Sequence, residues 1–163
     1  MLQSRRKISR VKGGKYTFQI TDWNTHKSQL QSIREQVFIQ EQDVPVELEW
    51  DGLDETARHV LAEVQCPAKQ KDEKLAIGTA RIIINNMQAH IGRMAVLSEW
   101  RYQGVGSRIL QTCIDECLKQ GVKEVVLNAQ VYALPFYQKA GFETSSEQFL
   151  DAGIPHKKMI RIL

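Results

Sequence analysis

The stretch "MAVLSEWRYQGVGSRIL", residues 94–110, contains the transition that decides the fold. An apolar segment with strand character ends near Leu97, and an amphipathic helix pattern starts near Gly104. Between them the residues follow the spacing R-x-x-G-x-G, formed by Arg101, Gly104 and Gly106. The first amides of a helix lack intrahelical acceptors and carry partial positive charge, so an anion fits there. The residues alone leave two interpretations open, a pyrophosphate site and a plain tight turn.

The spacing of this loop excludes two common nucleotide-binding motifs. A dinucleotide fingerprint reads G-x-G-x-x-G and needs an acidic residue at the end of the following strand, which this chain lacks. A Walker loop needs a Gly-Lys-Ser/Thr triplet, which is also absent. Any phosphate at this loop would therefore be held mainly by backbone amides, with Arg101 adding a full positive charge.

Working outward from the loop, the hydrophobic patterns predict a mixed α/β sheet with helices on its faces. Antiparallel strands in the first half give way to a β-α-β crossover in the second. Helices are expected at 25–40, 104–120 and 133–142. Strands are expected at 16–21, 59–64, 75–84, 88–97 and 122–130, with further candidates at 142–149 and 156–163.

The composition is that of an ordinary globular protein, with 163 residues, 42% hydrophobic and 25% charged. We expect a basic arm over 1–15, which holds six basic residues and no acid, followed by one domain over 16–163. The rest of the chain has no basic stripe, so nucleic-acid binding is not expected. No apolar run approaches the ~20 residues that cross a bilayer, so no membrane association is expected either.

The three cysteines predict neither a disulfide nor a metal site. Cys113 and Cys117 lie one helical turn apart on an apolar face, a geometry that suits a disulfide poorly, and Cys66 stands alone. Buried free thiols are typical of a reducing cytosol. The Cys and His spacings resemble no zinc site, so we expect a cytoplasmic protein without a metal.

Two motifs at matching separation give the chain a family resemblance. "MAVLSEWRYQGVGSRIL" resembles the coenzyme A motif of the GNAT superfamily of N-acetyltransferases, and "ALPFYQKAGF", residues 133–142, resembles that family's second signature. The segments "VFIQEQDVP", "RHVLAEV", "IGRMAVLSE", "NAQVYALPFYQKAGF" and "DAGIPHKKM" are similar to the ElaA/YjcF-like branch. The resemblance implies the GNAT-like acyl-CoA N-acyltransferase fold, whose mostly antiparallel sheet splays between its fourth and fifth strands.

The resemblance also implies a function. It predicts an acetyl-CoA-dependent N-acetyltransferase that moves an acetyl group to a primary amine by direct attack, with acetyl-CoA and an amine acceptor as its partners. A non-catalytic acyl-CoA-binding or regulatory module is the alternative, and homodimers are common in the family. By resemblance, the cofactor-binding residues are Met94, Ala95, Val96, Arg101, Tyr102, Gln103, Gly104, Val105, Gly106, Ser107, Gln130 and Tyr137. Gln130 departs from the family pattern, which has Asn there.

Direct attack requires a neutral amine and a proton for the departing thiolate. By its match to the family's Phe-Tyr position, Tyr137 is the expected acid, while a backbone amide near Val96 would stabilise the oxyanion. Glu41 is the leading candidate for the base or an acceptor ligand, since it ends a predicted helix beside the acceptor region. The alternative bases, each with a structural role as the competing interpretation, are His59, His90 and His156.

Overall fold

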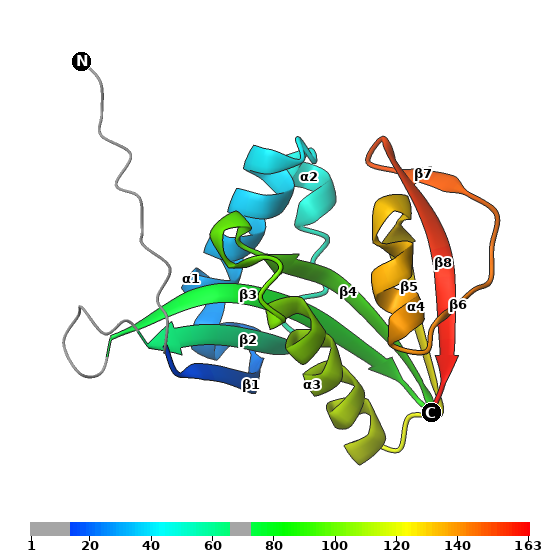
Figure 1. Cartoon of the computed structure of the whole chain (residues 1–163), viewed down its shortest axis with the longest axis horizontal. Helices are drawn as coiled ribbons and strands as arrows, with labels where there is room; N and C mark the ends of the chain where they lie inside the picture. Colours follow the sequence, from blue (N-terminus) through cyan, green and yellow to red (C-terminus); the bar gives the residue numbers. More distant parts are fainter. Residues whose placement is uncertain (1–13, 66–72) are drawn as a thin grey trace.

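The computed structural model describes residues 14–65 and 73–163, which form an eight-stranded mixed sheet with helices on both faces (Figure 1). Cys66 and most of the basic arm lie outside these residues. The strands are β1 (Tyr16–Asp22), β2 (Arg58–Gln65), β3 (Lys74–Asn85), β4 (Gln88–Val96), β5 (Glu124–Gln130), β6 (Glu143–Thr144), β7 (Phe149–Asp151) and β8 (Ile154–Ile162). The helices are α1 (Trp23–Arg34), η1 (Glu35–Glu41), α2 (Val46–Glu49), η2 (Ser98–Trp100), α3 (Val105–Lys119), η3 (Val131–Ala133) and α4 (Leu134–Lys139).

The strand order is β1-β2-β3-β4-β5-β8-β6, with β7 paired to β8. Neighbouring strands are antiparallel except β4 and β5, which the crossover through α3 makes parallel. The parallel pairing joins Gln88–His90 to Glu124–Val126 and goes no further. Beyond it the two strands diverge, as Figure 1 shows, and the predicted splay between the fourth and fifth strands is confirmed.

Helices α1 and α3 pack on opposite faces of the central strands (Figure 1). The apolar stripe of α3, which includes Ile109 and Cys113, joins the larger core under β2–β5, because residues three and four apart share one helix face. α1 buries Leu30 and Ile33 in a second cluster that includes Ala95 of β4. β4 is therefore packed on both faces along the part that diverges from β5.

The helix expected over 25–40 differs at both ends. It begins at Trp23 because the Asp22 carboxylate caps it, accepting hydrogen bonds from the backbone N–H and the hydroxyl of Thr25 at 2.9 and 2.7 Å. Its last part, η1, is a π-helix, in which the Gln42 amide bonds the Val37 carbonyl at 3.2 Å. π-turns are wider than α-turns, and apolar periodicity does not indicate them.

The C-terminal strands also differ from expectation. The strand expected over 142–149 is divided into β6 and β7, and both pair with the long strand β8. A tight turn joins β7 to β8, with left-handed backbone at Ala152 and Gly153. This hairpin, labelled β7 in Figure 1, stands across a gap from α2 and forms one side of the site described below.

Cys113 and Cys117 are free and buried, as expected, and burial raises the pKa of Cys117 to about 11.

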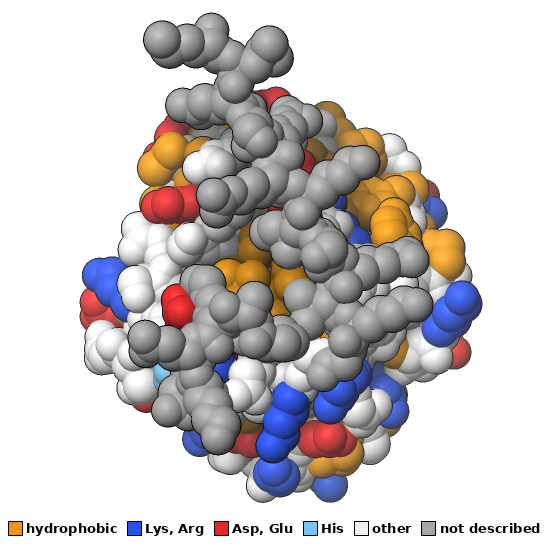
Figure 2. Space-filling view, turned by 60° about the vertical axis from the view of Figure 1, so that its left-hand side comes forward, with side chains coloured by type: hydrophobic (Ala, Val, Ile, Leu, Met, Phe, Trp, Pro, Cys, Tyr) orange, Lys and Arg blue, Asp and Glu red, His pale blue; other side chains and the backbone are white. Residues whose placement is uncertain are grey.

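On the face in Figure 2, Lys and Arg side chains of the described residues stand beside acidic and uncharged ones. No helix in the ranges 14–65 and 73–163 is both long and apolar enough to cross a membrane.

Candidate active site

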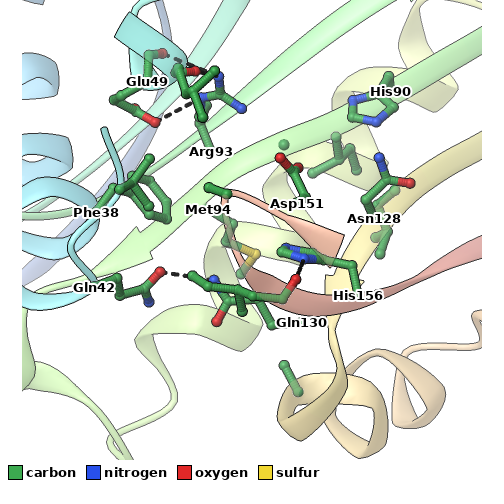
Figure 3. A pocket seen from close by; sticks show the side chains of 18 of the residues that line it. Phe38, Gln42, Glu49, His90, Arg93, Met94, Asn128, Gln130, Asp151 and His156 are labelled. Atoms are coloured by element: carbon green, nitrogen blue, oxygen red, sulfur yellow. Dashed lines mark hydrogen bonds and ion pairs between the residues drawn. The ribbon is translucent and has the colours of Figure 1, made fainter. Parts of the chain in front are cut away.

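A cleft of about 350 Å³ opens where β4 and β5 separate (Figure 3). A β-bulge in β4 shapes one side, where Arg93 has left-handed backbone (φ 49°) and the pairing with β3 shifts register. Side chains enter the cleft from η1, α2, β4, β5, η3, α4, β7 and β8, so elements distant in sequence meet there. Its lining includes Phe38, Gln42, Glu49, Asp51, His90, Arg93, Met94, Asn128, Gln130, Tyr137, Asp151 and His156.

The R-x-x-G-x-G loop follows the end of β4 and leads into α3. Tyr102 and Gly104 both have left-handed backbone, with φ of 59° and 80°, so the glycine at 104 suits its conformation. A Cβ at Gly104 would meet no atom within 4 Å, and one at Gly106 would make ordinary contacts with Phe136 and Met94. The space over Gly104 is thus open to another molecule, next to the first amides of α3.

Arg101 does not extend freely from this loop. Its Nε donates to the Val96 carbonyl at 2.9 Å, and its two terminal nitrogens donate to both carboxylate oxygens of Glu41 at 2.6 and 2.8 Å. We call Arg101 and Glu41 the loop pair. These hydrogen bonds lower the pKa of Glu41, because they stabilise its charged form. From the sequence, Glu41 is the leading candidate for the base. A carboxylate with a lowered pKa is a weaker proton acceptor, which makes that role less favourable.

Tyr137 reaches the cleft from α4. Its hydroxyl donates to the Met94 sulfur at 3.6 Å, and its ring packs edge-on against Phe136 and Phe142, with centroids 4.9 and 6.1 Å away. Burial raises the pKa of Tyr137, since a phenolate is poorly solvated among apolar groups. The phenol therefore keeps its proton at neutral pH, beside the segment of β4 that was expected to hold cofactor.

Gln130 spans the mouth of the cleft. Its side-chain amide donates to the Gln42 side-chain oxygen at 2.8 Å, joining the end of β5 to the residue after η1 (Figure 3). Gln130 thus lies at the splay, where the cofactor contact was predicted, and its present partner is a protein amide.

The wall of the cleft beside α2 contains a group of ionic side chains that sequence reasoning did not assemble. Arg34 is fully buried, bonds Glu49 and Asp54 at 2.5 Å each, and lies over the Trp23 and Trp50 rings. Arg81 bonds Asp51 and Asp54, and Arg93 bonds Glu49 and Asp51. We call this group the wall cluster: Arg34, Glu49, Asp51, Asp54, Arg81 and Arg93.

The wall cluster is balanced in formal charge, with three arginines and three acids. Hydrogen bonds from Arg81 hold the pKa of Asp51 well below its usual range, whereas burial raises that of Glu49. An excess of negative charge that would attract a cationic amine is therefore not present at Glu49, Asp51 and Asp54. The arginines nevertheless fix the segment after α2 against β3 and β4, which gives the cleft a firm side.

The histidines separate into two kinds. His59 is fully buried under Trp23, and its Nε2 bonds the Asp54 carbonyl at 2.9 Å, which is a structural role. His90 and His156 line the cleft from β4 and β8. Among the described residues, no group of three His, Cys, Asp or Glu side chains could hold a metal ion.

The comparisons with known proteins agree with this geometry. Residues 49–163 match the model of the acetyltransferase (GNAT) domain. The Bacillus subtilis (strain 168) protein named "Uncharacterized N-acetyltransferase YjcF" is 35% identical over 130 residues, covering 79% of this chain and 87% of its own length. Protein ElaA of Escherichia coli (strain K12) is 31% identical over 137 residues, covering 81% and 84%.

Solved structures show the same fold. The crystal structure of Escherichia coli ElaA has a TM-score of 0.76 at 27% identity and covers 90% of this chain and 99% of its own. An acyl-CoA N-acyltransferase from Pseudomonas aeruginosa has a TM-score of 0.74 at 23% identity, covering 89% and 99%. With the family model matching more than half of the chain, and a sheet splayed beside an R-x-x-G-x-G loop, this protein belongs to the GNAT family of acetyltransferases.

Proposed function

We propose that this protein is an acetyl-CoA-dependent N-acetyltransferase that acetylates a primary amine by direct transfer. The observation that carries the proposal is the separation of β4 from β5 after His90, directly beside a loop with left-handed backbone at Tyr102 and Gly104. The separated edge of β4 and the amides of the loop and of α3 offer two kinds of backbone site, one for an extended amide-containing arm and one for phosphates.

The residues present fit coenzyme A. The open space over Gly104 would allow close approach of a pyrophosphate to the amides from Arg101 to Ser107. The pantetheine arm would lie along Met94–Val96, with Gln130 and Tyr137 across the splay. Bound there, acetyl-CoA supplies an activated acetyl thioester. Holding both reactants in one cleft makes the transfer effectively intramolecular.

The protein's own groups would then stabilise the developing negative charge and donate the proton that the departing sulfur needs. A backbone amide near Val96 would stabilise the developing oxyanion, and Tyr137 would hold a proton at its phenolic oxygen for the departing sulfur. Burial, which raises the pKa of Tyr137, keeps that proton in place. Glu41 stays a candidate base, but its bidentate bonds to Arg101 support a different task, which is to orient that guanidinium at the end of β4.

The experiment is a panel of primary amines assayed for release of free coenzyme A thiol. We expect at least one class of amine to give thiol release together with an acetylated product. For that amine, Tyr137→Phe should lower kcat about 10²-fold, with little change in coenzyme A affinity, because it removes only a proton donor. Tyr16→Phe is the matched control, since Tyr16 packs against Trp100 away from the cleft.

Two results would count against the proposal. Coenzyme A binding without thiol release from any amine would favour the non-catalytic module. An unaltered kcat in Tyr137→Phe, where single-turnover kinetics show that chemistry limits the rate, would remove Tyr137 from the mechanism while leaving the transferase function in place.

A further inference from the structure

His156 occupies a constrained position in the cleft. It lies on β8, between Gln130 of β5 and Phe149 of β7 in the pairing register, and its side chain is buried. Figure 3 shows its ring projecting from β8 into the cleft that Met94 and Tyr137 also line. The Phe149 ring stacks on the imidazole with centroids 5.9 Å apart and planes inclined by 21°. The ring is thus held in place by its neighbours on two strands.

A hydrogen bond also fixes which nitrogen carries the proton. His156 Nδ1 lies 2.7 Å from the Ile154 carbonyl oxygen. A carbonyl oxygen can only accept, so Nδ1 is the donor and bears hydrogen. In the neutral ring Nε2 then has a free lone pair. This arrangement is a proton acceptor whose tautomer and orientation are both set by the fold.

The other candidate bases lack this combination. Glu41 already accepts two hydrogen bonds from Arg101, which lower its pKa. His59 lies in the core, with Nε2 engaged by the Asp54 carbonyl. His90 lines the cleft, but its pKa is lowered, mainly by burial. The positive charges of Arg81, Arg93 and Lys158 lower it further. Protonation of His90 is therefore opposed by its surroundings.

We propose that His156 is the general base of the transferase, an inference that rests on the function proposed above. Nε2 takes one proton from the acceptor ammonium, which frees the nitrogen lone pair to form the C–N bond. As the C–S bond breaks, the sulfur takes the Tyr137 proton, and the second proton lost by the nitrogen restores Tyr137. The imidazolium releases its proton to water, so one proton is released for each amide formed.

Several titratable and charged groups face the same cleft and belong in any account of its pH dependence. The phenol of Tyr137 keeps its proton through the pH range of the experiment below, because burial raises its pKa. The acids of the wall cluster are matched by arginines, as described above. The remaining groups that line the cleft are His90 and Arg93 on β4, Tyr132 on η3 and Asp151 on β7. Lys158 on β8 is not in the lining, but its charge acts on His90.

The test measures kcat/KM against pH, from about pH 5 to pH 9, for His156→Gln with an accepted amine. We expect a loss of about 10²-fold and a flattened acidic limb of the profile, with the coenzyme A Kd within twofold of wild type. His26→Gln is the matched control, because His26 bonds Thr21 at the start of α1 and lies outside the cleft. It should keep the wild-type profile.

Each other outcome has a defined meaning. A wild-type protein that acetylates no amine overturns the proposed function, whereas an active wild type with an unchanged profile in His156→Gln overturns only the base assignment. Loss of the acidic limb in His90→Gln but not in His156→Gln would move the base to His90. If His156→Gln does not fold, nitrogen NMR of the imidazole rings in the wild-type protein still tests the proposal, because it shows which ring nitrogen of His156 carries hydrogen. Hydrogen on Nε2 instead of Nδ1 in the neutral ring would contradict the proposal.

Discussion

The wall cluster and the loop pair both join arginine to carboxylate, yet they differ in burial. Arg34 of the wall cluster is fully buried and bonds two acids, whereas the loop pair leaves 31% of the Arg101 side chain and 42% of the Glu41 side chain exposed. Water and salt weaken an exposed pair, while a buried charge depends on its partners. One arrangement therefore maintains the shape of the cleft, and the other is free to exchange partners.

This difference assigns separate tasks to the two sides of the cleft. The wall cluster fixes the side of the cleft beside α2 by joining α1, α2, the segment after α2, β3 and β4. The loop pair stands after the end of β4, in the loop that contains the open Gly104, where an arriving phosphate could replace Glu41 as the partner of Arg101.

The largest effect is expected in the wall cluster. Arg34→Ala should lower the free energy of unfolding by about 3–5 kcal/mol, because it leaves Glu49 and Asp54 buried without their shared partner. Urea unfolding would measure the loss. Arg58→Ala is the matched control, since the Arg58 side chain is 47% exposed and its ion pair with Glu116 should contribute about 0–1 kcal/mol. Equal losses in the two variants would contradict the distinction.

The next effect concerns the loop. Gly104→Glu should weaken coenzyme A binding by at least about 10²-fold, or about 2.7 kcal/mol, by adding bulk and negative charge where phosphate is expected. Titration calorimetry would measure the affinity. Gly52→Glu controls for strain, because Gly52 has nearly the same φ, 79° against 80°, and equally open surroundings. An unchanged affinity in a folded Gly104→Glu protein would exclude the loop as the phosphate site.

A smaller effect should appear as a pH dependence of stability. Asp51 bonds Arg81, so its pKa is lower in the folded protein than the unfolded value near 3.9. Its ion pairs therefore stabilise the fold above that pH, and the stabilisation is lost as pH falls through the folded pKa. Asp51→Asn should cost roughly 1–2 kcal/mol at pH 7 and progressively less below about pH 4. A cost that does not change with pH would show that the charge of Asp51 is not what matters.

The smallest effect is expected at Glu41. Glu41→Gln should change the free energy of unfolding by less than about 1 kcal/mol, as for other exposed pairs. If Glu41 only orients Arg101, kcat/KM for the accepted amine should fall by less than about tenfold and keep its acidic limb. If Glu41→Gln instead lowers kcat/KM by about 10²-fold and removes the acidic limb of the pH profile, Glu41 is the base. That result would contradict the view that Glu41 only orients Arg101.

Much of the fold could be predicted because it depends on local pattern. Alternating apolar residues indicated the strands, and the stripe through Ile109 and Cys113 indicated α3. The glycine at 104 was picked out by the loop spacing, whereas its left-handed backbone is seen only in the structure. The π-helical turn of η1 was missed, since it depends on how the chain packs after Arg34 and not on a sequence period.

The site could be predicted only in part, because its contacts join residues far apart in the chain. The motifs placed Tyr137 and Gln130 at the splay, where the structure has them. They could not reveal that Arg101 meets Glu41, 60 residues away, or that Arg34 meets Asp54 across 20 residues. His156 was one of several histidines in the sequence, and it is distinguished only by contacts that the fold creates: its place in the cleft, the stacked Phe149 ring and the bond to the Ile154 carbonyl.

If coenzyme A binds between the separated edge of β4 and the glycine loop, amide hydrogen exchange of the wild-type protein, with and without saturating coenzyme A, will show where. We expect added protection in peptides covering residues 94–107, and little change in peptides covering 49–54, which contain the acids of the wall cluster. Protection at 49–54 without any at 94–107, under conditions where calorimetry shows binding, would contradict this placement of coenzyme A.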